Sequence, residues 1–324
     1  MKGALILSLI LFVLPVSLPD LTKDNLVVFS SLSYYGCDFD GDRLGDLAVW
    51  DPRKNTLYFQ LTTNNEFYNK RFFENDLKYI PVFADYDGDE KTDFGFFQPD
   101  TAQWILYLTT TPGIPSKLFL GATGDLPSPA NIDGDNQYEP TIWRPTNSAW
   151  LLSKKDEKGN VKQSVVFDGS FQDSAFSGDY DGDGKSDLLN WRPDDGYWHI
   201  VKSGTEFDFN QSEHIQHGQE WDIIIPNDYN ADKRCDLVFW RPEDKKWYFF
   251  YAGSQNQKQI TFGEKGDIPA SLDIDGDGIP ELVMWNMGKK SWNVLNTKNN
   301  ESYSYKWHVP DGCIPAISIL HTFE

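Results

Sequence analysis

The chain has few of the side chains that serve nucleic-acid binding, zinc binding or catalysis. Its 324 residues include three cysteines, five histidines and 29 lysines and arginines, against 49 aspartates and glutamates. The formal net charge of −20 argues against nucleic-acid binding, which needs clustered cations to neutralise phosphates. The histidines are scattered, and no catalytic constellation of histidine, serine or cysteine stands out. Three cysteines leave at least one thiol without a disulfide partner in the same chain.

Long apolar runs are confined to the N-terminus. Lys2 precedes an apolar stretch over residues 4–14, which predicts a secretory signal peptide at residues 1–19. We therefore expect a secreted or cell-surface protein. Pro15 lies unfavourably before Ser17 at the expected cleavage site, so an uncleaved signal anchor is the alternative. No other stretch is long enough to span a membrane.

What the sequence has in abundance is an acidic loop of nine residues. Six copies, spaced 45 to 49 residues apart, carry acidic or amide side chains at positions 1, 3, 5 and 9. In chain order these side chains are Asp38, Asp40, Asp42 and Asp46 in loop 1; Asp85, Asp87, Asp89 and Asp93 in loop 2; Asn131, Asp133, Asp135 and Glu139 in loop 3; Asp179, Asp181, Asp183 and Asp187 in loop 4; Asp228, Asn230, Asp232 and Asp236 in loop 5; and Asp273, Asp275, Asp277 and Glu281 in loop 6.

Carboxylates this close raise one another's pKa, so the bare loop is unfavourable unless a cation compensates. Calcium fits best, because it takes about six to eight oxygen ligands in flexible geometry, whereas magnesium demands an octahedron and keeps its waters. Zinc would need histidine or cysteine, which the loops lack apart from Cys235. We expect the backbone carbonyl of position 7, as at Leu44, Lys91 and Lys185, to complete the set of calcium ligands. Six calcium ions would reduce the net charge from −20 to −8. The alternative is a solvated acidic turn rich in Asp and Gly.

An EF-hand is excluded by position 12, where its loop needs a bidentate glutamate. The six loops carry Val49, Phe96, Ile142, Asn190, Phe239 and Met284 there. These residues lie in short runs of strand-forming residues, such as 47–50 and 282–285. Each loop is therefore expected to lead directly into a strand.

Large apolar residues recur with the same period. An aromatic residue closes each of those strands, at Trp50, Phe97, Trp143, Trp191, Trp240 and Trp285. Seven positions later come Leu57, Trp104, Trp150, Trp198, Trp247 and Trp292, after a turn that predicts a hairpin. A weaker strand follows, and a Gly-Asp-x-Pro segment, as at 124–127 and 266–269, approaches the next loop. Four strands per unit predict an all-β propeller, because each small sheet buries its faces only against neighbouring blades.

We expect six to seven four-stranded blades. Residues 312–320 match the approach to a seventh loop, and residues 26–29 match the last strand of a preceding unit. The chain ends would then pair into a short seventh blade, which we favour, or overlap to close a ring of six. A disulfide between Cys37 and Cys313 would staple the ring, whereas Cys235 is expected to be a free thiol.

These repeats resemble the FG-GAP or VCBS repeats, which occur in integrin α-chain propellers, in some fungal lectins and in secreted bacterial proteins. The resemblance rests on the Asp-x-Asp-Gly-Asp-x-x-x-Asp loop, the Trp-Arg-Pro segment and the Gly-Asp-x-Pro approach, and it covers residues 26–324 as one domain. It implies up to six calcium ions, each in a loop that joins two strands of a blade. Loops 3 and 5 depart from the pattern through Asn131, Glu139, Asn230 and Ala231, so loops 1, 2 and 4 are expected to bind tightest.

The expected function is a noncatalytic binding or adhesion module for an extracellular protein or glycan, with structural calcium. Trp221 is the candidate ligand residue, since Gly124 and Gly266 hold its position in other repeats and an exposed Trp could stack on a sugar ring. Local packing of Trp221 is the alternative, and His214 and His217 are expected at the surface. The alternative function is a calcium-dependent polysaccharide lyase or hydrolase, because calcium-bearing propellers occur among glycan-active enzymes.

Overall fold

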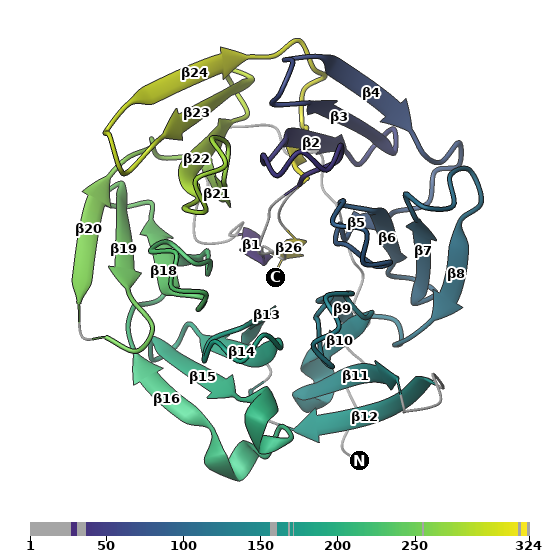
Figure 1. Cartoon of the computed structure of the whole chain (residues 1–324), viewed down its shortest axis with the longest axis vertical. Coiled ribbons are helices and arrows are strands. Elements are labelled where there is room, and N and C mark those ends of the chain that lie inside the picture. Colours follow the sequence, from purple (N-terminus) through teal and green to yellow (C-terminus); the bar gives the residue numbers. More distant parts are fainter. Residues whose placement is uncertain are drawn as a thin grey trace, which may run out of the picture.

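The structure, a computed structural model, describes residues 27–30, 37–155, 161–167, 169–170, 172–254, 256–316 and 319–322. Within these residues, six four-stranded antiparallel sheets stand as blades around a central axis (Figure 1). The predicted all-β propeller is therefore confirmed. No helix in the described part has the length and apolar character of a membrane span. The predicted signal peptide, residues 1–19, lies outside the described residues.

Each blade runs from an innermost strand near the axis to an outermost strand at the rim. Blades 1 to 3 are β25 (Ile314–Pro315), β2 (Leu47–Asp51), β3 (Thr56–Gln60) and β4 (Phe67–Arg71); β5 (Ile80–Pro81), β6 (Phe94–Gln98), β7 (Gln103–Tyr107) and β8 (Ser116–Phe119); and β9 (Leu126–Pro127), β10 (Thr141–Arg144), β11 (Ala149–Lys155) and β12 (Val161–Phe167). Blades 4 to 6 are β13 (Ser174–Gly178), β14 (Asp187–Arg192), β15 (Tyr197–Val201) and β16 (Glu213–Gln216); β17 (Ile223–Ile224), β18 (Leu237–Arg241), β19 (Lys246–Phe250) and β20 (Gln257–Thr261); and β21 (Ile268–Leu272), β22 (Glu281–Asn286), β23 (Ser291–Leu295) and β24 (Ser302–Lys306). Short 3-10 helices occur at η2 (Pro145–Asn147), η3 (Ser203–Thr205) and η4 (Phe209–Gln211).

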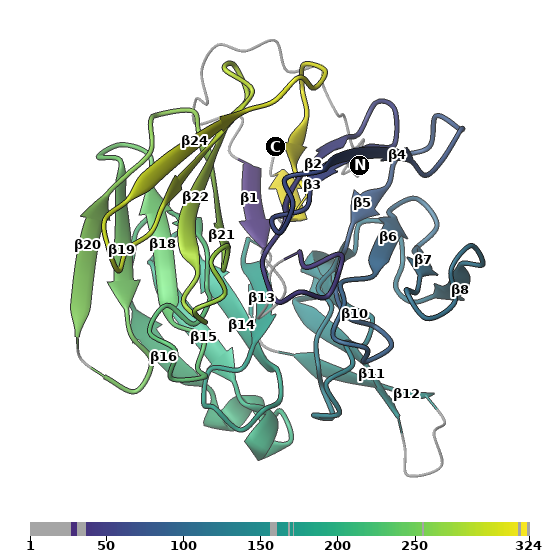
Figure 2. The same ribbon diagram turned by 45° about the horizontal axis from the view of Figure 1, so that its top comes forward.

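The expectation of a seventh blade is wrong. The segment that resembles an approach to a seventh loop forms β25, which pairs with β2 and supplies the innermost strand of blade 1. Blade 1 is thus built from strands of both ends of the chain, which closes the ring. The remaining terminal strands, β1 (Val27–Ser30) and β26 (Ile319–Thr322), pair antiparallel inside the ring, where β1 contacts β13 and β17 and β26 contacts β5 (Figures 1 and 2).

The predicted hairpins form, and their large apolar residues are direct cross-strand partners. Trp143 lies opposite Trp150, and their ring centroids are 5.6 Å apart. Trp285 and Trp292 repeat the pair at 5.0 Å. Ten of the twelve tryptophans are less than 2% exposed. Burying these rings against neighbouring sheets contributes much of the hydrophobic stabilisation of a blade, so these tryptophans are core residues and not ligand residues.

The strand order separates the connections onto two faces of the ring. In blades 2 to 6 the acidic loop joins the first and second strands, as the family resemblance implied, whereas loop 1 leads into β2 and the first strand of blade 1 comes from the C-terminal segment. The connection between the third and fourth strands returns to the same face. We call this the loop face. The hairpins between second and third strands and the connections between blades lie on the opposite face.

The possible disulfide between Cys37 and Cys313 does not form, because all three cysteines are free, and Cys235 is a free thiol as expected. Cys37 packs in the apolar cluster that blade 1 shares with blade 2, together with Phe83 and Phe96. Cys313 packs in the cluster that blade 1 shares with blades 5 and 6, together with Trp285. Blade 1 thus stands between the two thiols.

Candidate metal centres

The six acidic loops share one backbone conformation, which their own carboxylates hold. In loop 1, the Asp38 carboxylate accepts the N–H groups of Gly41 at 2.7 Å and Arg43 at 2.8 Å. Position 4 has a positive φ in all six loops, from 59° at Ala231 to 83° at Gly134, which explains why glycine occupies it five times. In every loop the position-5 side chain accepts the N–H of position 7, at 2.8 to 3.0 Å. Loops 3 and 5 therefore keep the fold of the loop despite their sequence departures.

The last carboxylate of each loop is the most deeply buried. Asp46, Asp93, Asp187 and Asp236 are 0% exposed, and Glu139 and Glu281 are 4% exposed. Each accepts the N–H of position 2 of its own loop, at 2.7 to 3.0 Å. In four blades a second N–H arrives from the connection that follows the third strand, as from Thr62 to Asp46 at 2.8 Å. In these four blades the backbone thus fixes the carboxylate at both oxygens.

Burial raises the pKa of five of these position-9 carboxylates, and the neighbouring acids raise it further. The pKa is about 7 for Asp46, Asp187, Asp236 and Glu281, and about 6 for Asp93. Backbone N–H donors lower each value but do not restore the ordinary range. The bare loops therefore carry an electrostatic cost that a bound cation would relieve.

In five loops, three acids offer oxygen atoms that lie within 4.8 Å of one another. These groups are Asp38, Asp40 and Asp42; Asp85, Asp87 and Asp93; Asp133, Asp135 and Glu139; Asp179, Asp181 and Asp187; and Asp273, Asp275 and Glu281. Loop 5 forms no such carboxylate group in the described residues, because an amide, Asn230, stands at position 3. The predicted ligands outside these groups are Asp46, Asp89, Asn131, Asp183 and Asp277 of the five loops, and Asp228, Asn230, Asp232 and Asp236 of loop 5.

The clusters of loops 1 and 2 contain buried carboxylate oxygens that accept no hydrogen bond. These atoms are Asp40 Oδ1, Asp42 Oδ2 and Asp87 Oδ1. An ionised oxygen that is shielded from water and has no donor is costly to the folded state. Oxygen atoms are the ligands that calcium prefers, and their number and grouping suit a hard divalent cation. The residues present therefore fit the calcium ion that the sequence predicts.

Neighbouring loops are connected in series around the loop face. The N–H of position 8 donates to the position-1 carbonyl of the preceding loop, as from Cys235 to Asp179 at 2.6 Å. Four further bonds of this kind join loops 2 to 1, 3 to 2, 4 to 3 and 1 to 6, at 2.5 to 2.8 Å. Position 8 of loop 6 is Pro280, which has no N–H to donate. Loop 5, which faces loop 6 at this junction, has Ala231 at position 4, where the other loops have glycine. The contact between blades 5 and 6 therefore differs from the other contacts between blades.

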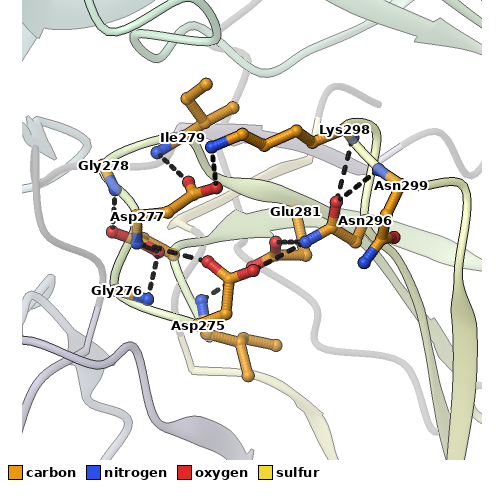
Figure 3. Close-up of polar contacts among 11 residues, drawn as sticks. Asp275, Gly276, Asp277, Gly278, Ile279, Glu281, Asn296, Lys298 and Asn299 are labelled. Carbon is orange, nitrogen blue, oxygen red and sulfur yellow. Dashed lines mark hydrogen bonds and ion pairs between the residues drawn. The ribbon is translucent and has the colours of Figure 1, made fainter.

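Side chains from the third-to-fourth strand connections also reach the loops, and the sequence analysis missed them. Thr109 and Ser203 donate their hydroxyl groups to Asp89 at 2.7 Å and Asp183 at 3.0 Å. In blade 6, Lys298 and Asn296 reach the acids of loop 6 (Figure 3). Aligning the repeats on their loops would have shown hydroxyl residues at a fixed distance after position 9 in blades 1, 2 and 4.

On the opposite face, the Gly-Asp-x-Pro aspartate binds the arginine of the Trp-Arg-Pro segment. Arg241 Nε and Nη2 donate to the two oxygens of Asp222 at 2.7 and 2.8 Å. Equivalent bidentate pairs occur in blades 3 and 4, and blade 6 replaces the arginine with Asn286, which donates to Asp267. Both motifs were recognised in the sequence, but not their contact.

Trp221 lies beside this pair, in the turn before β17. Its φ is 77°, close to the values of 88° and 92° at the equivalent Gly124 and Gly266. The side chain is half-buried, which makes it the most exposed of the twelve tryptophans, since ten are below 2% and Trp307 is 5% exposed. A tryptophan in this conformation is strained.

The histidines of blade 4 lie on its outer strands and beyond them. His199 and His214 are cross-strand partners on β15 and β16, with their Nδ1 atoms 2.8 Å apart. His214 is exposed as expected, whereas His217 is half-buried against Phe239 and Phe250. Burial lowers the pKa of His217 to about 4, so this imidazole is neutral at physiological pH.

No protein-family model matches the sequence, and no curated protein matches it. Solved structures match in fold. A lectin from Agrocybe aegerita that recognises non-reducing terminal N-acetylglucosamine has a TM-score of 0.57 at 13% identity, over 87% of this chain and 80% of the lectin. A streptogramin B lyase has a TM-score of 0.51 at 11% identity, over 88% of each chain. At these identities the likeness shows the β-propeller fold alone.

Proposed function

We propose that the protein is a secreted or cell-surface calcium-binding β-propeller that serves as a noncatalytic binding or adhesion module for a protein or glycan. The observation that carries the calcium assignment is the group of buried, unpartnered oxygens on Asp40, Asp42 and Asp87. They lie within compact carboxylate clusters that repeat around one face. A net charge of −20 agrees with cation binding and opposes a nucleic-acid partner.

The residues of loops 1, 2 and 4 would hold calcium most tightly, because each loop has four aspartates at positions 1, 3, 5 and 9. A bound ion would supply the positive charge that offsets the repulsion among these acids. The loop backbone is already arranged by the position-1 and position-9 carboxylates. Little reorganisation of the chain is then needed on binding, which favours affinity.

The ligand surface is proposed on the opposite face, where Trp221 is held in a strained conformation beside the ion pair of Asp222 and Arg241. Strain of this kind accumulates at functional sites. The half-buried indole offers part of a flat apolar face for the ring of a sugar. A glycan is therefore the first ligand class to test, and the fold likeness to a lectin of N-acetylglucosamine gives a first probe.

Calcium titration into the chelator-stripped protein tests the proposal. We expect calorimetric binding at several sites together with a rise in Tm, because a ligand that binds only the folded state stabilises it. Magnesium at the same concentration serves as the control and should raise Tm less. The calcium-loaded protein is then applied to a glycan array, with Trp221→Ala as the matched variant. No binding and no stabilisation by calcium would refute the calcium assignment.

A further inference from the structure

In loop 6 the acidic side chains already contact a cation of the protein itself. Lys298 Nζ donates to Asp277 Oδ2 at 2.9 Å (Figure 3). Asn296 Nδ2 donates to Asp275 Oδ2 at 2.7 Å and to Glu281 Oε1 at 2.9 Å. Both donors come from the connection between β23 and β24, which covers the loop. Three of the four predicted metal ligands of loop 6 thus have side-chain donors.

Loops 1 and 2 differ from loop 6 in this respect. Among the described residues, the buried oxygens without a hydrogen-bond partner include atoms of Asp40, Asp42 and Asp87, but no carboxylate oxygen of loops 4, 5 or 6. The two kinds of loop have the same acidic positions, so the difference comes from the residues around the loop. In loop 6, side chains of the protein supply donors to the acidic side chains, whereas in loops 1 and 2 some buried carboxylate oxygens have no donor.

The position of Lys298 faces the loop acids in other blades too. Lys298 lies seventeen residues after Glu281, and the equivalent residue is Thr110 in blade 2 and Gly204 in blade 4. The Thr110 hydroxyl donates to Asp87. A side chain at Gly204 would start 3.7 Å from Asp183 Oδ2 and 4.0 Å from Asp181 Oδ2. A lysine at this position can therefore place its ammonium group among the acids of the loop.

We propose that Lys298 is the resident cation of loop 6 and takes the place of a calcium ion there. The inference rests on the proposed calcium binding of the other loops. Its consequence is that the protein binds calcium at no more than five loops. Loop 6 then keeps its geometry in the absence of calcium, and its Asp273 carbonyl accepts the Gly45 N–H of blade 1, the blade in which the two ends of the chain meet. The junction at ring closure is thereby independent of calcium.

A reciprocal exchange of charge tests the proposal. Lys298→Gln removes the ammonium group and keeps a side chain of similar length, while Gly204→Lys places one over loop 4. Gly204 has an ordinary negative φ, so the substitution is compatible with its backbone. Bound calcium per chain is counted by equilibrium dialysis for the purified protein. We expect one ion more than wild type for Lys298→Gln and one fewer for Gly204→Lys. Lys265→Gln, an exposed lysine of the opposite face, should leave the number unchanged.

Thermal unfolding separates this role from that of an ordinary surface ion pair. Lys298→Gln should lower Tm in chelator and recover it in calcium, whereas loss of a simple ion pair would lower Tm equally in both. Equal calcium stoichiometry in Lys298→Gln and wild type would overturn the inference, and Lys298→Gln decides alone if circular dichroism shows that Gly204→Lys is unfolded. Absence of calcium binding in every variant would instead refute the proposed function, and the inference with it.

Discussion

Thr92 of loop 2 forms two hydrogen bonds to Asp38 of loop 1. The Thr92 N–H donates to the Asp38 carbonyl at 2.7 Å, and the Thr92 hydroxyl accepts the Asp38 N–H at 3.0 Å. Ser186 and Asn131 repeat this arrangement between loops 4 and 3. A residue of one blade thereby fixes the first ligand position of the blade before it. The candidate metal sites are therefore parts of one connected series of loops, interrupted at the junction of loops 5 and 6, and not six separate turns.

The first prediction concerns this contact. Thr92→Val removes the hydroxyl while keeping the shape of the side chain, and leaves the buried Asp38 N–H without its acceptor. Thr92 is 5% and Asp38 3% exposed, so water cannot replace the hydroxyl. We expect a loss of about 1–3 kcal/mol in the free energy of unfolding, measured by urea denaturation.

The matched control is Thr101→Val, on an exposed turn of the opposite face in blade 2. Its effect should stay within about 0.5 kcal/mol, as for surface substitutions in general. If the two variants are equally stable, the hydrogen bond between the Asp38 N–H and the Thr92 hydroxyl makes no contribution to the free energy of unfolding.

The second prediction is a pH dependence that calcium reverses. Burial raises the pKa of Asp46, Asp187 and Asp236 to about 7, whereas an unfolded aspartate has a pKa of about 3.9. Between these values the folded state binds more protons than the unfolded state. The contribution of these groups to stability is therefore full below about pH 4 and is lost as the pH rises to about 7.

We expect Tm of the calcium-free protein to fall from pH 5 to pH 8. Calcium must displace the protons of these carboxylates, so its affinity should rise over the same range and level off above about pH 7. Thermal unfolding in chelator and in excess calcium, at each pH, measures both effects. A calcium-free Tm that rises with pH would contradict the assignment of raised pKa values to the loops.

The third prediction concerns the buried ion pair of the opposite face. Asp222 is 2% exposed and is bound at both oxygens by Arg241. Burial raises the pKa of Asp222 despite the opposing effect of Arg241. Arg241→Met leaves a buried carboxylate without its cation, for which we expect a loss of about 3–5 kcal/mol in the free energy of unfolding.

A double-mutant cycle provides the control. Adding Asp222→Asn to Arg241→Met removes the stranded charge and should recover part of the loss, because replacing both partners costs less than removing one. Strict additivity of the two single substitutions in urea denaturation would mean that the residues do not interact.

The sequence predicts those features that depend on residues close together in the chain. The loop ligands lie within nine residues of one another, and Trp143 and Trp150 face each other across a short hairpin, so spacing alone identifies them. A two-residue strand such as Ile314–Pro315 carries too little pattern to show which blade it joins. The fragment could therefore begin a seventh blade or complete the first, and only the pairing with Trp50 decides.

The contacts that complete the site are distant in the sequence. Thr92 meets Asp38 from the next blade, and Lys298 reaches Asp277 from a connection whose residues vary between repeats. No single repeat contains both partners of the first contact, and the second occurs in one blade among the described residues. Their prediction requires the relative positions of neighbouring blades, which the period of the sequence does not give.

The last prediction isolates the backbone strain at Trp221. Its φ of 77° lies in the left-handed region, where glycine stands at the equivalent positions 124 and 266. Trp221→Gly and Trp221→Ala both delete the indole, so they differ mainly in the cost of this conformation. The Cβ of alanine makes it less favourable by about 1 kcal/mol. Trp221→Gly should therefore be the more stable variant by about that amount in urea denaturation. Both variants should lose any glycan binding that the wild-type protein shows, because the proposed stacking surface is gone. Equal stability of the two would mean that the turn relaxes, and Trp221 would then carry no stored strain to mark it as a functional residue.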